Sequence, residues 1–291
     1  MNKAITRNPH ALEIHILQSI WRNVFGSVGE ESFFIHFYDP QLCIIAEYNK
    51  TPVSAGYLIP FGNMICGLKS IPCAMIYSVA TLSEFRGKGL GTAVVNELIT
   101  LANKIGYPAV VLCPVNDEVF NYYTAHTDFR EGFYINEQII TEPHCNSQAT
   151  PLTEVSFSEY DSLREEILEG AAHIKHDLRV LEYQALLCKE LGGGFFKFGD
   201  ACCVVERQPC GDVWVKELLT PKTINNDQYA GSLVDDLLSS IMPNFPSSRY
   251  VVRTPSKLGT GNRFGMLSYA KHSELDLSIS SADPWYGMAF D

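Results

Sequence analysis

The sequence predicts an α/β (α+β) protein built from two domains in tandem. The first half shows helical and strand-like segments in an order that the second half repeats. A polar segment with two prolines, at 141–151, separates the halves. The length of 291 residues accommodates two domains of ordinary size. We therefore expect one domain at 1–145 and a second at 150–291.

The first half reads as two helices, three strands, a glycine-rich loop, a helix, a strand and a helix. Apolar residues from Leu12 to Val24 recur at helical spacing, which predicts a helix over 10–25. Apolar runs at 43–48 and 53–59 predict two strands with a tight turn at Asn49-Lys50. The other expected elements are a short helix at 30–36, strands at 74–80 and 109–115, a helix at 92–99 and a helical stretch at 120–123.

The second half repeats this order. Ser158 is expected to cap a helix that runs to Leu168. A second helix, 178–191, is expected to end at the glycines 192–194. The expected elements that follow are a hairpin of 195–198 with 201–205, a strand at 213–219, a helix at 227–241 and a strand at 249–253.

Composition excludes several classes of protein. Hydrophobic residues make up 46% and charged residues 19%, which is typical of a globular chain. No apolar stretch is long enough to span a bilayer, and 1–7 is not followed by a signal-peptide core, so a cytoplasmic protein is expected. The net charge of −11 argues against nucleic acid and is compatible with a cationic acceptor such as an amine.

Cysteine and histidine usage predicts no metal site. Nine cysteines form no C-x-x-C pair, so buried thiols in a reducing compartment are the simplest interpretation. His173 and His176 are spaced to share a helix face, and we expect them to be a solvated pair because no third ligand lies nearby.

The most informative segment is the loop Arg86-Gly87-Lys88-Gly89-Leu90-Gly91, between a strand-like run and a helical run. Such a loop exposes backbone N–H groups at a helix N-terminus, which suits a phosphate, and Arg86 and Lys88 add positive charge. A Walker A loop is excluded because glycine follows Lys88, and the third glycine comes one residue too early for a Rossmann fingerprint. A basic turn that only caps a helix is the structural alternative.

This loop resembles the R-x-x-G-x-G signature of the GNAT superfamily of acetyl-CoA-dependent N-acetyltransferases. The flanking sequence is similar too, because Asn116 is followed seven residues later by Tyr123. The Gly-Phe of the superfamily is Asp128-Phe129 here, with an apparent insertion around Thr127. The resemblance implies a mixed, mostly antiparallel sheet flanked by helices in each of two tandem GNAT-like domains.

The resemblance also implies a binding site for acetyl-CoA as co-substrate. Backbone groups of Val79, Ala80 and Thr81 would pair with the pantetheine arm, and the Val79 N–H would face the thioester carbonyl. Asn116 would hold the arm near the reaction centre. The pyrophosphate would meet the N–H groups of Gly87, Lys88, Gly89, Leu90, Gly91 and Thr92.

The implied reaction is direct attack of a primary amine on the thioester in a ternary complex. Tyr123 would be the acid that protonates the leaving thiolate, and Tyr122 is the alternative acid. The structural alternative for Tyr123 is a role as a core aromatic residue. The base is not identified, with Glu31, Glu47 and Glu84 all open. The acceptor would be an amine-bearing small molecule or a peptide. A non-catalytic acyl-CoA sensor or scaffold, or an acyltransferase for a longer chain, is the alternative function.

The second half lacks the glycine loop. Its counterpart, 220–226, has no glycine, and Pro221 supplies no N–H, so no pyrophosphate is expected there. A degenerate second domain is similar to the plan of the enhanced-intracellular-survival acetyltransferases, whose sterol-carrier-like domain this chain is too short to hold. In those relatives the C-terminal carboxylate reaches the catalytic centre, which implies a catalytic role for Asp291. The alternative is that the aromatic tail, with Trp285, Tyr286, Met288 and Phe290 buried, only completes a sheet.

Overall fold

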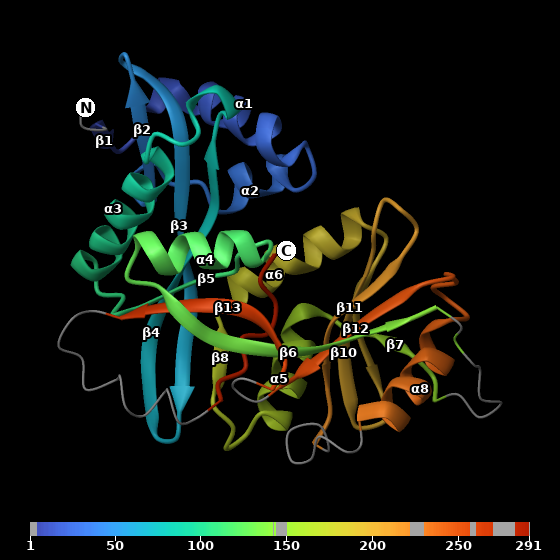
Figure 1. Cartoon of the computed structure of the whole chain (residues 1–291). Coiled ribbons are helices and arrows are strands. Elements are labelled where there is room, and N and C mark those ends of the chain that lie inside the picture. Colours follow the sequence, from blue (N-terminus) through green and yellow to red (C-terminus); the bar gives the residue numbers. More distant parts are fainter. Residues whose placement is uncertain are drawn as a thin grey trace. The chain divides into compact units, whose positions relative to one another are not determined.

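The computed structural model describes residues 5–141, 143, 150–221, 230–256, 260–269 and 283–290. These residues form two compact units. Figure 1 labels the helices and strands and colours them by their position in the sequence. The first unit holds 5–64, 70–131 and 265–269, and the second holds 65–69, the described part of 132–264, and 283–290. Each unit therefore includes a segment from the other half of the sequence. The two domains at 1–145 and 150–291, which are contiguous in sequence, remain a prediction.

The sheet of the first unit has the strand order β1-β2-β3-β4-β5-β13. The pairs β1–β2, β2–β3 and β5–β13 are antiparallel, and β4 runs parallel to β5. Its last strand, β13, comes from near the chain's end and pairs Met266 with Leu112. The elements are β1 Ile5–Arg7, α1 Ile14–Phe25, α2 Glu30–His36, β2 Cys43–Tyr48, β3 Thr51–Cys66, β4 Lys69–Thr81, α3 Leu90–Lys104, β5 Ala109–Leu112, α4 Asp117–His126 and β13 Asn262–Tyr269, with 3-10 turns η1 Ala11–Glu13, η2 Pro40–Leu42 and η3 Ser83–Phe85.

Helix α3 packs closely on β3 at Gly56. A Cβ atom added there would lie 2.9 Å from Val94 Cγ1 and 3.0 Å from Leu98 Cδ1, both on α3, and 3.2 Å from Val79 Cγ2 on β4. Tyr57, the next residue, points to the opposite face, where it contacts Trp21 of α1 and Phe33 of α2. Because successive residues of a strand face opposite sides of the sheet, β3 packs against α3 on one face and against α1 and α2 on the other.

The second unit repeats the strand order of the first. In its sheet, β9-β10-β11 are antiparallel, β11 is parallel to β12, and β12 pairs antiparallel with β6 from the first half of the chain. The short β7 pairs with β9. The elements are β6 Arg130–Ile140, β7 Thr153–Glu154, α5 Phe157–Ile167, β8 His173–His176, α6 Leu178–Glu190, β9 Gly194–Phe198, β10 Ala201–Arg207, β11 Val213–Leu219, α8 Ala230–Ile241 and β12 Tyr250–Pro255.

A fully buried polar cluster lies between α5 and β11 of the second unit. Glu217 accepts hydrogen bonds from Tyr160 Oη at 2.6 Å, from Arg164 Nε at 3.0 Å and from Trp285 Nε1 at 2.5 Å. Gly287 is required beside it, because an added Cβ would lie 2.6 Å from Arg164 Nη2. The C-terminal tail is therefore part of this unit's core. Trp285, Tyr286 and Met288 are buried as expected, and Phe290 is half-buried.

The α/β fold class, with mostly antiparallel strands flanked by helices, is confirmed. Two local expectations are wrong. The N-cap of α5 is Ser156, whose hydroxyl accepts from the Glu159 N–H at 3.1 Å, and not Ser158. His173 and His176 lie on a strand and are 4% and 3% exposed, so they are a buried pair and not a solvated one. Burial, with the nearby Arg164 charge, lowers the pKa of His176 well below its ordinary value.

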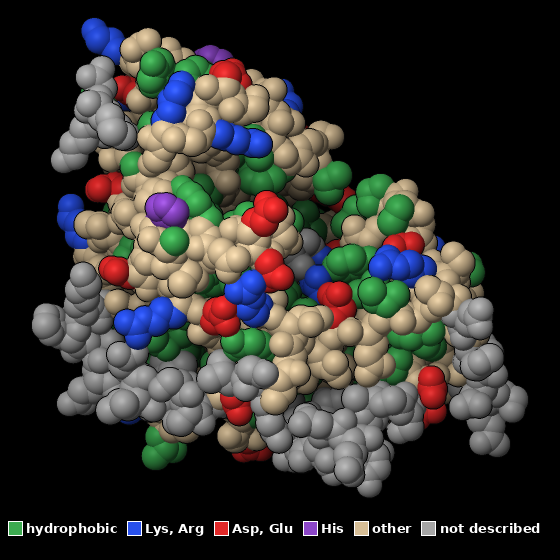
Figure 2. All heavy atoms as spheres, viewed as in Figure 1, with side chains coloured by type: hydrophobic (Ala, Val, Ile, Leu, Met, Phe, Trp, Pro, Cys, Tyr) green, Lys and Arg blue, Asp and Glu red, His purple; other side chains and the backbone are tan. Residues whose placement is uncertain are grey.

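Two further observations concern the surface. Among the described residues, no helix is long and apolar enough to cross a membrane. On the face drawn in Figure 2, acidic and basic side chains are interspersed with apolar ones. The charge of this face is therefore mixed.

Gly56→Ala should destabilise the protein by about 1–3 kcal/mol, because the added methyl overlaps side chains of a packed core. Urea unfolding followed by circular dichroism measures the loss. Gly56→Ala combined with Val94→Ala removes the nearest overlapping atom and should recover part of the stability. A Gly56→Ala variant as stable as the parent would show that α3 is not held at this distance.

Candidate functional site

The candidate site begins where β4 and β5 stop pairing. Their parallel pairing covers only Cys73–Met75 with Ala109–Val111. Strand β4 continues to Thr81, so Val79, Ala80 and Thr81 lie beyond the part of the strand that pairs with β5 in the described residues. Val79, Ala80 and Thr81 lie on this open edge. An open strand edge of this kind pairs with an extended ligand that carries amide groups.

A local irregularity of β4 lies at the same place. Ser78 has a φ of +49°, which is uncommon for a residue other than glycine. On either side of it, Ile76 and Val79 both pack into the core beneath α3, whereas strict alternation would put them on opposite faces. Ser78 thus acts as an inserted residue, and it shifts the backbone groups of 79–81 out of the regular ladder. Sequence reasoning missed this feature, since serine carries no signal for it.

The glycine loop leads directly into α3. Gly87 and Gly89 both have a φ of +75°, a conformation that favours glycine, and Gly89 is the N-cap of the helix. The first hydrogen bond of the helix joins the Ala93 N–H to the Gly89 carbonyl at 3.0 Å. The N–H groups of Leu90, Gly91 and Thr92 precede it and have no carbonyl one turn earlier. These three donors, with the positive end of the helix dipole, form a place for an anion.

Two cations flank this loop. Arg86 is exposed, and its Nε donates to the Thr81 carbonyl at 3.1 Å, which joins the loop to the end of β4. Lys88 Nζ lies 4.6 Å from the centre of the Tyr48 ring and 4.9 Å from that of Phe85. Both side chains are thereby held near the start of α3 while their charge stays at the surface.

Hydroxyl groups connect β3 to the end of β4. Ser54, which is fully buried, donates to the Ala80 carbonyl at 2.8 Å, and its Oγ lies 2.8 Å from Thr81 Oγ1. The backbone at Val53 accepts from the Leu82 N–H at 3.0 Å. These bonds fix the open edge from the β3 side, so it is rigid where a ligand would meet it.

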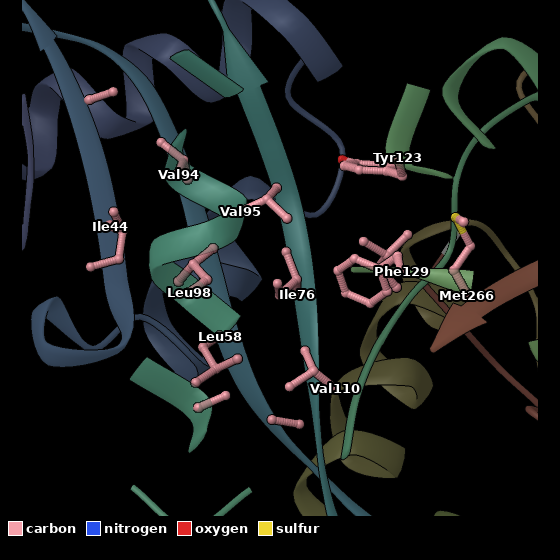
Figure 3. Close-up of a cluster of buried hydrophobic side chains, with 14 of the residues drawn as sticks. Ile44, Leu58, Ile76, Val94, Val95, Leu98, Val110, Tyr123, Phe129 and Met266 are labelled. Atoms are coloured by element: carbon pink, nitrogen blue, oxygen red, sulfur yellow. The ribbon is translucent and has the colours of Figure 1, made fainter. Parts of the chain in front are cut away.

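Asn116 and Tyr123 lie at the start and near the end of α4. Asn116 is the N-cap, and its side-chain oxygen accepts from the Val119 N–H at 3.0 Å, which leaves its amide N–H groups for a ligand. Tyr123 points its hydroxyl toward β4 (Figure 3), and its ring packs with Phe129 at 6.2 Å. Burial raises the pKa of Tyr123, so its hydroxyl stays protonated at neutral pH.

Tyr122 has a different environment from its neighbour. Its side chain is 38% exposed, and its hydroxyl hydrogen-bonds to Thr92 Oγ1 in the first turn of α3. The His126 ring stacks on it, with ring centres 4.8 Å apart. The two tyrosines that the sequence left as alternatives therefore point to different parts of the site.

The three carboxylates considered as bases are placed differently. Glu47 accepts from Arg7 Nε at 2.8 Å, so it is committed to an ion pair. Glu84 is fully exposed, and hydrogen bonds from its own backbone N–H and from Ser83 lower its pKa. Glu31 is exposed on α2. Asp291 lies outside the described residues, as does the counterpart loop from 222 onward.

An aromatic cluster covers the face of β3 and β4 opposite α3, and sequence reasoning did not identify it. Trp21 stacks on Phe33 with ring centres 4.9 Å apart and lies 5.8 Å from Tyr77, the residue before Ser78. Trp21 Nε1 and Tyr38 Oη are buried and have no hydrogen-bond partner among the described residues. The helical spacing of Phe33 and Phe37 was the only available signal. Among the described residues, no group of three or more acidic, histidine or cysteine side chains is arranged for a metal ion.

Comparisons with known proteins agree with this geometry. The profile of the acetyltransferase (GNAT) family matches residues 14–129, which include β4, the loop, α3 and α4. No curated protein sequence matches the chain significantly.

Solved structures share the fold over most of the chain. A GCN5-related N-acetyltransferase from Anabaena variabilis is 12% identical with a TM-score of 0.66, over 91% of this chain and 72% of that one. Eis1 from Mycobacterium abscessus is 12% identical with a TM-score of 0.58, over 91% and 73%. A putative acetyltransferase from Pyrococcus horikoshii is 15% identical with a TM-score of 0.57, over 99% and 95%.

Ser78→Val should destabilise the protein by about 1–2 kcal/mol, because a β-branched side chain clashes with the backbone at positive φ. Ser78→Gly should be tolerated. Thermal unfolding of both variants gives the comparison, and Ser70→Val, an exposed position on the same strand, is the matched control. Equal effects of valine at 70 and 78 would argue against the irregular backbone.

Proposed function

Since the chain belongs to the acetyltransferase (GNAT) family through residues 14–129 and is an acyltransferase, we propose that it moves an acetyl group from acetyl-CoA to a primary amine. The observation that carries this proposal is one continuous set of groups in the first unit. The open edge of β4 leads to the bare N–H groups of α3, and the Tyr123 hydroxyl points toward the same strand.

The proposed position of the cofactor follows from these groups. The pantetheine arm lies along β4 and exchanges hydrogen bonds with the backbone of Val79, Ala80 and Thr81 in place of a strand. Its pyrophosphate meets the N–H groups of 87–92, with Arg86 and Lys88 adding charge at the rim. The Asn116 amide donates to the arm from the α4 side. No metal takes part in this proposal.

The proposed chemistry needs a nucleophile, a polarised carbonyl and an acid. The neutral amine nitrogen attacks the thioester carbon, and the Val79 N–H stabilises the charge that develops on the carbonyl oxygen. The C–S bond then breaks, and Tyr123 donates its proton to the departing thiolate. Burial suits Tyr123 to this role, because its raised pKa keeps the proton available until the thiolate forms.

The base that deprotonates the incoming ammonium is not one of the carboxylates near the glycine loop. Glu47 is engaged by Arg7 and Glu84 has a lowered pKa, so both are poor bases. We propose a water molecule or the carboxylates of Asp291 for this step. A cytoplasmic location also belongs to the proposal, since Cys43, Cys73 and Cys203 are free, buried thiols, which fits a reducing compartment.

Thiol release from acetyl-CoA tests the function directly. The purified chain is assayed with polyamines, aminoglycosides, amino acids and peptides, which cover small-molecule and peptide amines. Turnover with any of them supports the proposal. Tight binding of acetyl-CoA without turnover across the panel would favour a sensor. Turnover only with longer acyl-CoA donors would show that the enzyme transfers a longer acyl group than acetyl.

Gly89→Asp and Gly91→Asp should abolish acetyl-CoA binding, because each places a carboxylate where the pyrophosphate is expected. Calorimetric titration of the wild-type chain should give a stoichiometry near one per chain. Gly89→Asn is the control for Gly89→Asp, since asparagine has the same shape and also tolerates positive φ. Two sites per chain, or equal binding by the Asp and wild-type proteins, would exclude this location.

Tyr123→Phe should lower kcat by about ten- to a thousandfold, within the range expected for loss of a general acid, with little change in acetyl-CoA affinity. Steady-state kinetics and titration measure the two effects separately. A variant that keeps its kcat and loses only stability would make Tyr123 a core aromatic residue.

A further inference from the structure

The contact between Tyr122 and Thr92 joins α4 to the first turn of α3. The Tyr122 hydroxyl hydrogen-bonds to Thr92 Oγ1, at the third residue of the helix. A second observation places the same hydroxyl at this helix end. A Cβ atom built on Gly91, the preceding residue, would lie 3.9 Å from Tyr122 Oη and 3.4 Å from Thr81 Oγ1. The hydroxyls of Thr81, Thr92 and Tyr122 therefore surround the start of α3.

His126 fixes the Tyr122 ring. Its Nδ1 lies 2.9 Å from the Tyr122 carbonyl oxygen, which can only accept, so Nδ1 carries the proton and donates. The imidazole ring then stacks on the tyrosine ring with an angle of 27° between their planes. This contact holds an exposed tyrosine with its hydroxyl directed toward α3.

We propose that Tyr122 is a positioning residue that orients Thr92 toward the cofactor's pyrophosphate, an inference that rests on the proposed function. A hydroxyl has one proton and two acceptor lone pairs. When Tyr122 donates to Thr92 Oγ1, the threonine proton is directed elsewhere, toward the anion held by the N–H groups of 90–92. Thr92 then supplies a charge-assisted hydrogen bond in addition to its backbone N–H. Tyr122 acts through Thr92, while Tyr123 acts on the thiolate.

The test compares acetyl-CoA binding by variants of this pair. Tyr122→Phe and Thr92→Val should each weaken the Kd by about tenfold, the effect of one lost hydrogen bond to a charged group. The double variant should bind no more weakly than either single variant, because both remove the same bond. Thr92→Ser keeps the hydroxyl and should bind within about twofold of wild type. Tyr123→Phe, which removes the neighbouring hydroxyl, should leave the Kd unchanged.

Kinetics separate this role from a general structural one. In the thiol-release assay, Tyr122→Phe should raise the KM for acetyl-CoA while kcat at saturation and the melting temperature hold. With S-acetylpantetheine as donor, which has no pyrophosphate, Tyr122→Phe and wild type should have the same kcat/KM.

Several results would overturn the inference. These are an unchanged Kd in Tyr122→Phe, additive losses in the double variant, or an equal loss with S-acetylpantetheine. A loss of kcat with an unchanged Kd would instead make Tyr122 the acid. If the wild-type chain does not bind acetyl-CoA at all, the proposed function fails before any variant is measured.

Discussion

Strands β4 and β5 pair over three residues and then separate, and the candidate site exists because of that separation. A strand leaves backbone donors and acceptors exposed wherever its neighbour ends, and such groups need a partner. In the first unit, β4 extends six residues past Met75 and is held on its other side by Ser54 and the backbone at Val53. The close approach of α3, which Gly56 permits, then brings the N-terminus of a helix to the end of this open edge.

Sequence reasoning succeeded where the signal is local. The glycine loop and helical segments at 92–99 and 120–123 were predicted, because glycine content and apolar spacing depend on neighbouring residues. Helices α3 and α4 extend beyond both predicted segments, with Gly89 and Asn116 as their N-caps. The irregularity at Ser78 could not be predicted, because it depends on how Ile76 and Val79 both pack under α3. His173 and His176 were misread because the spacing of three fits a helix, whereas their burial comes from distant parts of the second unit.

The two units show how one strand arrangement accepts different chemistry. In each unit, two strands pair in parallel over three residues. The pairing of β4 with β5 ends at Met75, and that of β11 with β12 ends at Val215. Two residues further, the first unit has Tyr77 in an aromatic cluster with Trp21 and Phe33. The second unit has Glu217 at the equivalent register, buried with Tyr160, Arg164 and Trp285. In the second unit, Trp285 from the end of the chain donates a hydrogen bond to the Glu217 carboxylate on β11. A side chain of the protein itself therefore occupies this position.

Each sheet includes one strand from the other half of the sequence, β13 in the first unit and β6 in the second, and this affects how the chain folds. The edge of β5 is paired by β13, and Leu112 and Met266 are more than half the chain length apart in sequence. The edge of β12 is paired by β6, again across a long separation. Neither sheet can be finished from one half of the sequence, so the first unit must wait for nearly all of the chain to be synthesised. Contacts of such separation carry a large loop-closure cost and slow folding. During that interval the β5 edge is an unpaired strand, and an unpaired strand edge favours misassembly between chains.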